Sequence, residues 1–297
     1  MSSAAALLFY QARDLTGGKF GAVDAPCPLC GPQRRSAANQ YRKTLRLWCT
    51  DPSFISYHCA RCGEQGWASN SDAIRSNAPP IDTLAIAAEV QRREQDETRE
   101  RLKVAMSLWR RRTPIEGTAA ETYLRQVRCY GGRLPATLGF LPASGDFAPA
   151  MIAAFGMARE TLPGELVIDD AAVRGIHLTK LKADGSGKAD TDPNKVMVGR
   201  SVGFPIVLAP VNDLLGLSIA EGIEDVLSLH EATGLGAWAA GSASRLPQLA
   251  ERIPSYVETV SIAADDDKDG LKYADQLGQI ILHRRECRIL VPSGGGS

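Results

Sequence analysis

Four cysteines fall into two pairs with the spacing of a metal site. Cys27 and Cys30 form one Cys-x-x-Cys pair, and Cys59 and Cys62 form a second. Each pair can present two thiolates from a tight turn, and four thiolates are a ligand set that tetrahedral Zn²⁺ takes in closed structural sites. The total of seven cysteines is odd, which argues against a disulfide framework. We therefore expect one structural Zn²⁺ on these four residues.

The segment between the pairs predicts a hairpin that brings them together. Residues 44–48 and 54–58 alternate between apolar and polar side chains, as paired strands do. His58 and Cys49 are alternative ligands, although a polar strand end and a buried thiol are the favoured interpretations. Cations and flat rings nearby would suit single-stranded nucleic acid, although about half of the rings could instead pack a small core. These neighbours are Arg42, Lys43, Arg46, Trp48, Tyr57, Arg61 and Trp67.

Acidic residues follow two apolar segments near the end of the chain. Glu221-Gly-Ile-Glu-Asp225 comes directly after the strand predicted to end at Ala220, and Asp265-Asp-Asp-Lys-Asp269 follows the one predicted to end at Ala264. Ligands of an open parallel sheet gather at the carboxyl ends of its strands, so both stretches should face one crevice. Carboxylates crowded in this way suit Mg²⁺ or Mn²⁺, which prefer hard oxygen ligands. The candidate metal-binding and catalytic residues are Glu221, Asp225, Asp265, Asp267 and Asp269.

Acidic residues at helix N-termini have a simpler explanation, because they stabilise the helix dipole. That interpretation accounts for Glu224 and Asp266. It does not account for three aspartates at i, i+2 and i+4 before a glycine. The helix dipole therefore explains some of the acidic residues, and metal binding is still needed to explain the three aspartates.

The elements that must position these residues form an α/β protein. Strands and helices alternate over the last 80 residues, which predicts a parallel sheet flanked by helices. Strands are expected at 217–220, 237–240, 259–264 and 288–291, and helices at 223–232, 245–252 and 271–285. Earlier in the chain, residues 69–82 have the composition of a linker, and residues 83–112 predict one long charged helix that Pro114 stops. The expected domains are a zinc ribbon (1–75), a linker and helix (76–114), a mixed α+β region (115–210), the parallel-sheet domain (211–292) and a flexible tail (293–297).

Composition excludes several classes of protein. The chain has 297 residues, 44% of them hydrophobic and 23% charged, values typical of a globular protein. Lys and Arg balance Asp and Glu at 34 each, yet residues 1–75 carry a net charge of +4 (nine against five) and residues 211–292 carry −6 (seven against thirteen). No apolar run spans a bilayer and no signal peptide is evident, so we expect a cytoplasmic protein without a membrane partner.

The last 80 residues resemble the Toprim domain of bacterial-type primases, topoisomerases and some nucleases. The resemblance lies in Glu221-Gly-x-x-Asp225, in Ala240-Gly-Ser242 and in Asp265-x-Asp267-x-Asp269-Gly270. The first motif is most similar to the primase version. Tyr57-His-Cys-Ala-Arg-Cys-Gly-Glu-Gln-Gly-Trp67 also resembles the metal-binding turn of primases, although Cys30 stands where many bacterial primases have His. Residues 175–203, with Asp192-Pro-Asn-Lys195, resemble the basic region that precedes Toprim in phage and plasmid primases.

The resemblance implies a DNA primase that makes short primers on single-stranded DNA. The acidic residues would hold two Mg²⁺ or Mn²⁺ ions for nucleotidyl transfer, with Glu221 either a ligand or a general base. Cations for NTPs and template would come from Arg174, Lys180, Lys195 and Arg200, with Lys180 and Lys195 the preferred pair. Lys182 and Lys188 fit a solvated hairpin equally well. Because no Gly-x-x-x-x-Gly-Lys-Ser/Thr motif is present, a helicase or another replication protein is the expected partner.

Other functions fit the same residues. A Toprim nuclease would use the same ions to hydrolyse DNA. A non-catalytic module would bind single strands for a partner enzyme. A topoisomerase is disfavoured, because it needs a nucleophilic tyrosine in a large gate that this chain has too little sequence to build.

Overall fold

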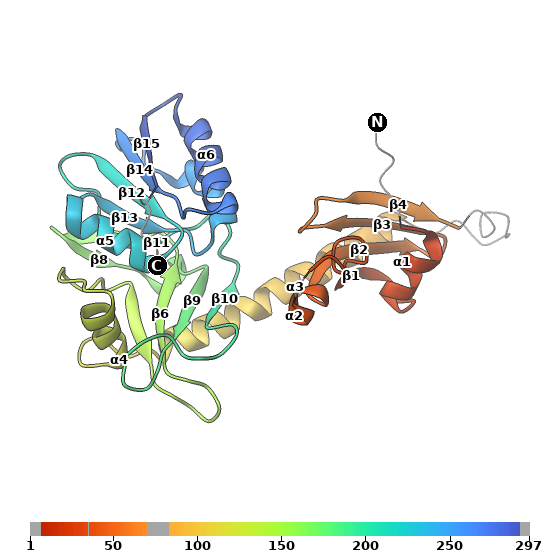
Figure 1. Ribbon diagram of the computed structural model, residues 1–297, viewed down its shortest axis with the longest axis horizontal. Helices are drawn as coiled ribbons and strands as arrows, with labels where there is room; N and C mark the ends of the chain where they lie inside the picture. Colours follow the sequence, from red (N-terminus) through yellow and green to blue (C-terminus); the bar gives the residue numbers. More distant parts are fainter. Residues whose placement is uncertain (1–6, 35, 71–82, 292–297) are drawn as a thin grey trace. The chain divides into compact units, whose positions relative to one another are not determined.

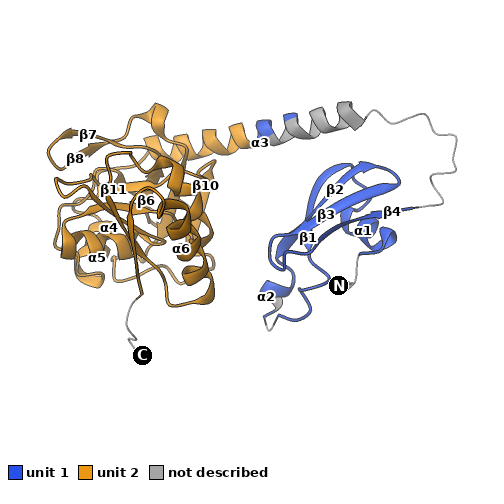
Figure 2. Cartoon of the chain, turned by 90° about the horizontal axis from the view of Figure 1, so that it is seen from above, with its two compact units in different colours: residues 1–97 blue, residues 98–297 orange. Residues whose placement is uncertain are grey.

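The computed structural model describes residues 7–34, 36–70 and 83–291. It divides into two compact units, residues 1–97 and 98–297, and the division falls within helix α3 (Thr83–Arg110) (Figure 2). Helix α3 confirms the long helix that was predicted for residues 83–112. Most of the predicted linker and the predicted tail lie outside the described residues.

The first unit is built on a four-stranded antiparallel sheet in the order β1-β2-β3-β4 (Figure 1). Alternate residues of β2 and β3, among them Leu45, Leu47 and Ile55, are buried in a core that also includes Ala12 of helix α1. The predicted hairpin is confirmed as β2 and β3. The elements are α1 (Phe9–Thr16), β1 (Gly21–Pro26), α2 (Ala37–Gln40), β2 (Lys43–Asp51), β3 (Phe54–Cys59) and β4 (Gln65–Ser69).

The second unit begins with the end of α3 and an antiparallel sheet in the order β10-β9-β6-β5. Ala105 and Trp109 of α3 pack against one face of this sheet, beside Ile152 and Ile176. Its strands are β5 (Leu138–Leu141), β6 (Ala150–Phe155), β9 (Gly175–Lys180) and β10 (Lys195–Gly199). Around them lie α4 (Ala119–Thr122), a π-helical turn (Tyr123–Val127), the hairpin β7 (Arg159–Leu162) and β8 (Glu165–Val167), and a 3-10 turn (Asp170–Ala172).

The remainder of this unit is the predicted α/β sheet, in the order β11-β13-β12-β14-β15. Four strands are parallel, and β11 joins β13 antiparallel. The helix predicted for residues 245–252 is wrong in type, because two short 3-10 helices, Ala243–Arg245 and Pro247–Arg252, occupy that segment. Pro247 has no N–H to carry α-helical bonding across the junction. The other elements are β11 (Ile206–Ala209), β12 (Gly216–Ala220), α5 (Ile223–Thr233), β13 (Gly236–Ala239), β14 (Thr259–Ala263), α6 (Lys268–Ile281) and β15 (Glu286–Leu290).

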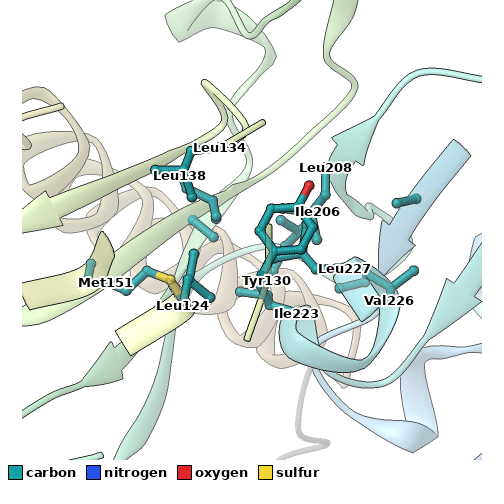
Figure 3. Packing of buried hydrophobic residues seen from close by; sticks show 14 of the residues in the cluster. Leu124, Tyr130, Leu134, Leu138, Met151, Ile206, Leu208, Ile223, Val226 and Leu227 are labelled. Carbon is teal, nitrogen blue, oxygen red and sulfur yellow. The ribbon is translucent and has the colours of Figure 1, made fainter. Parts of the chain in front are cut away.

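Each face of this sheet has its own hydrophobic core. Ala274 and Leu277 of α6 pack with Ile219 and Ile262 on one face. On the other, α5 shares a core with the antiparallel sheet, and Figure 3 shows Met151 near Leu124 and the α5 side chains Ile223 and Leu227 close together in that core. This shared core fixes α5 relative to the β9–β10 hairpin. Among the described residues, no helix is long and apolar enough to cross a membrane.

Candidate functional site

The four cysteines of the first unit form one compact group. Their sulfur atoms all lie within 4.8 Å of one another, with Cys27 Sγ 4.0 Å from Cys62 Sγ and Cys30 Sγ 3.9 Å from Cys59 Sγ. A tetrahedral site with bonds of about 2.3 Å would hold sulfur atoms roughly 3.8 Å apart. The spacing and the thiol chemistry therefore fit Zn²⁺. Cys49 is a buried thiol outside this group, and His58 is an exposed strand residue, so the favoured interpretation of each is confirmed.

Backbone N–H groups around the second cysteine pair favour the thiolate form of Cys59. Burial raises the pKa of Cys59, but the N–H groups of Cys62 and Arg61 outweigh it and lower that pKa to about 6. Burial raises the pKa of Cys27 to about 12. Four thiolates this close together require a cation, since negative charge on one opposes ionisation of the next.

The outer face of the first unit's sheet carries aromatic and charged side chains. Trp67 is 64% exposed, and its ring stacks on Phe54 with centroids 5.9 Å apart. Trp48 lies in register with Ser56 and Ser56 with Trp67, so strand alternation places both tryptophans on this face. Tyr57 is 2% exposed and accepts a hydrogen bond from Leu7 N, so it belongs to the core rather than to the surface.

In the second unit, strand register brings the two acidic stretches together. Ala220 of β12 pairs with Ala263 of β14 in a parallel arrangement, so Glu221 and Asp265 emerge from the same sheet edge. Burial raises the pKa of Glu221, and the charges of Asp265 and Asp267 raise it further. Burial likewise raises the pKa of Asp265, together with Asp225 and Asp267. Four of the predicted acidic residues therefore share one electrostatic environment.

Other contacts shape this acidic edge. Asp267 caps α6 by accepting a hydrogen bond from Gly270 N at 2.7 Å. The Asp225 carboxylate lies 3.8 Å from Arg128, a residue that sequence analysis did not single out. A β-carbon on Gly222 would require the Asp225 carboxylate to move from its present position. Asp269 is exposed in the first turn of α6. Within the described ranges, only the four cysteines form a closed group of potential metal ligands, so metal binding by these carboxylates remains a prediction.

Glu224 lies in the first turn of α5, as the helix-dipole interpretation expects, and it also has contacts that sequence analysis did not predict. It is 3% exposed and accepts a hydrogen bond from the Tyr123 hydroxyl at 2.9 Å. Its carboxylate also lies 3.0 Å from Lys188 Nζ and 3.8 Å from Lys195 Nζ. Burial raises its pKa, but the two ammonium groups outweigh burial and lower it to about 2. No local signal reveals this role, because the partners lie far away in the sequence.

The four predicted cations do not gather at one place. Lys195 pairs with Thr179 across the β9–β10 ladder, so alternation places Lys180 on the opposite face of the sheet. Lys180 donates instead to the carbonyl of Pro193 at 2.9 Å. Arg174 and Arg200 lie at the other end of the hairpin, where the N–H of Arg200 donates to the carbonyl of Arg174. Lys188 is paired with Glu224, whereas Lys182 lies in the exposed turn, 3.4 Å from Asp190.

Comparisons with known proteins match the second unit in two parts. Residues 216–295 match the model of the Toprim domain, and residues 99–208 match a domain of unknown function, DUF7146. No curated protein matches the chain.

Three solved structures are similar to parts of the chain. The Aquifex aeolicus primase (zinc-binding and RNA polymerase domains) has 14% identity, covers 93% of this chain and 74% of its own, and gives a TM-score of 0.39. The primase fragment of the bacteriophage T7 primase-helicase protein has 13% identity, coverages of 90% and 89%, and a TM-score of 0.34. A DNA primase domain from Pseudomonas aeruginosa has 13% identity, coverages of 58% and 56%, and a TM-score of 0.34.

The Toprim resemblance and the predicted fold class are thus confirmed. The five-stranded sheet of the second unit is mostly parallel and flanked by helices, and the family match covers its four parallel strands. The cysteine group of the first unit fits a zinc ribbon. Residues 216–295 of the chain match the Toprim domain, and a cysteine cluster of the zinc-ribbon type precedes that domain.

Proposed function

We propose that this chain is a primase that joins nucleotides on a single-stranded DNA template. The observation that carries the proposal is one sheet edge where Glu221, Asp225 and Asp265 lie near two lysines paired with Glu224. Nucleotidyl transfer needs carboxylates for metal ions and cations for a triphosphate. This edge supplies both.

The carboxylates suit Mg²⁺ or Mn²⁺. They are hard oxygen donors, and burial, followed by the negative charge of neighbouring carboxylates, raises the pKa of Glu221 and Asp265. Glu221, Asp225, Asp265 and Asp267 are the proposed ligands, with Asp269 at the margin. Two such ions, when bound, lower the pKa of an attacking hydroxyl and neutralise the leaving pyrophosphate.

The lysines are the proposed contacts for the substrate phosphates. Lys188 and Lys195 have side chains that are 30% and 39% exposed, so each ammonium faces both Glu224 and solvent. An ammonium has three N–H donors, and a bond to Glu224 occupies one of them. The others can bind a phosphate beside the carboxylates. Arg174 and Arg200, at the far end of the hairpin, are proposed contacts for the template backbone.

The first unit is the proposed template reader. The stacked rings of Phe54 and Trp67 offer flat surfaces to unpaired bases, and Lys43 at the start of β2 is an exposed cation. Zn²⁺ on the four cysteines would hold this sheet together without taking part in the chemistry. Unwinding of duplex DNA is assigned to a partner helicase.

Incubation of the full chain with NTPs, Mg²⁺ and single-stranded DNA tests the proposal. Labelled products that require both template and complementary NTPs are expected. Shortening of the template without NTP incorporation would support the Toprim nuclease instead. Template binding with neither product would support a non-catalytic binding module.

A further inference from the structure

Glu224 lies where three elements of the second unit meet. It is carried by α5, it accepts from Tyr123 in the π-helical turn, and it faces Lys188 and Lys195 from the β9–β10 hairpin. It is one of the few charged side chains that the structure buries. A buried carboxylate is tolerated only when cations and hydrogen bonds compensate it. Three donors surround this one.

Lys195 stands between two acidic groups. Its ammonium is 3.8 Å from Glu224, and its charge also lowers the pKa of both Glu221 and Asp265. Lys195 is in register with Thr179 of the neighbouring strand. It shares a strand face with Met197, and this face packs toward the Toprim domain. A β-carbon on Gly241, at the same sheet edge, would come within 3.2 Å of the Met197 sulfur. The charge of Lys195 thus acts on two of the proposed metal ligands as well as on Glu224.

We propose that Glu224 is a positioning residue that holds Lys195 away from Glu221 and Asp265 and so leaves those carboxylates available to divalent metal ions. The inference rests on the proposed metal site. Without the Glu224 charge, Lys195 would still be attracted to Glu221 and Asp265, on which its charge already acts. An ammonium paired with them would have to be displaced before a metal ion could bind.

A double-mutant cycle measured with Mn²⁺ alone tests this role. Mn²⁺ binding is followed by electron paramagnetic resonance, without nucleotide or DNA, for the wild-type chain, Glu224→Gln, Lys195→Met and the double variant. Simple electrostatics predicts that Lys195→Met tightens Mn²⁺ binding by the same factor in both backgrounds. The proposal predicts that the gain in the Glu224→Gln background exceeds the gain in the wild-type background by about fivefold or more.

Control variants separate positioning from stability. Glu231→Gln makes the same change on an exposed residue near the end of α5 and should leave Mn²⁺ affinity unchanged. Glu224→Asp keeps the charge and should restore most of the affinity lost in Glu224→Gln. If Glu224→Gln fails to fold, the background is changed to the double variant Lys188→Met with Glu224→Gln, which removes one charge of each sign. Lys195→Met is then added to that background. The expected gain in Mn²⁺ affinity again exceeds the gain in the wild-type background.

Two results would overturn the inference in distinguishable ways. Equal gains from Lys195→Met in the two backgrounds would remove the positioning role and leave the proposed function intact. Absence of saturable Mn²⁺ binding to the wild-type chain would remove both.

Discussion

Two glutamates at positions 221 and 224 have pKa values shifted in opposite directions, although burial alone would raise both. Glu221 is surrounded by other carboxylates, so its pKa is raised by burial and then by Asp265. Glu224 faces Lys195 and Lys188, which lower its pKa despite stronger burial. A bound cation would compensate the negative charge around Glu221, whereas the charge of Glu224 is already compensated by the two lysines. Neutralising each residue should therefore have opposite effects on stability.

Glu224→Gln should lower the free energy of unfolding at pH 7 by about 2 to 3 kcal/mol. The folded-state pKa, about 2, lies below the ordinary value of 4.5, so the ionised group contributes stability above pH 4.5. That contribution is lost as the pH falls through about 2. Urea denaturation of the wild-type chain and of Glu224→Gln should show a difference in the free energy of unfolding that narrows between pH 4.5 and pH 2. Glu231→Gln is the control. A gap independent of pH would contradict the assignment.

Asp265→Ala should remove the response of thermal stability to Mg²⁺. Without metal, the variant should have an unchanged or higher Tm, because one of several repelling charges is gone. Wild-type protein should gain about 2.7 kcal/mol of stability when Mg²⁺ is present at 100 times its Kd. Asp266→Ala, a matched change at the adjacent exposed position, should keep that gain. Loss of folding in Asp265→Ala would indicate a structural role instead.

Residues whose partners are close in sequence were the predictable ones. Cys-x-x-Cys pairs and the Glu-Gly-x-x-Asp turn define their own geometry, so the cysteine group could be predicted from spacing alone. The role of Glu224 could not be predicted, because it depends on lysines in a separate sheet and on Tyr123, which is 101 positions away. For the same reason the sequence does not reveal that Lys180 and Lys195 lie on opposite faces of their sheet, since the register of β9 and β10 decides this.

At the scale of elements, the zinc ribbon depends on its metal. The core of the first unit is small and includes the buried cysteines 27, 30 and 59, so charge on their thiolates must be compensated for the sheet to stay folded. The protein purified without added metal should contain one Zn²⁺ per chain by elemental analysis. Cys59→Ser should lose it, whereas Cys49→Ser should keep it. Zinc retained by a protein that carries both Cys27→Ser and Cys59→Ser would contradict the assignment.

The outer sheet face of the same unit should bind bases and phosphates through different residues. Trp67→Ala should weaken binding of single-stranded DNA by about tenfold without changing its salt dependence, because stacking involves no counterion release. Lys43→Ala should flatten the slope of log affinity against log salt by roughly 0.7. Tyr10→Ala removes an exposed ring from α1, which packs on the other sheet face, and should change neither quantity. Equal effects of Trp67→Ala and Tyr10→Ala would exclude this face as the template reader.

Elements with strong periodicity were predictable, and their assembly was not. The βα alternation after residue 216 and the β2–β3 hairpin follow directly from local pattern. The order β10-β9-β6-β5 depends on pairings between distant segments, which local pattern does not encode. The 3-10 geometry at Pro247 reflects a single missing N–H within an otherwise helical pattern.

At the scale of the whole chain, charge is separated although the total is zero. Residues 1–75 carry +4 and residues 211–292 carry −6. A metal-free Toprim edge therefore repels nucleic acid, and divalent ions reverse the local sign where the chemistry is proposed. Template binding and metal binding are thus assigned to different parts of one chain. The proposed primer synthesis requires both.

Template-dependent primer synthesis by matched site variants tests the central claim most directly. Wild-type protein and Asp266→Ala should both extend products on single-stranded DNA with NTPs and Mg²⁺. Asp265→Ala should lower the rate by at least about a thousandfold, as loss of a metal ligand in a two-metal site would. Primer synthesis by Asp265→Ala at the wild-type rate would contradict the account, because it would place the chemistry away from this sheet edge.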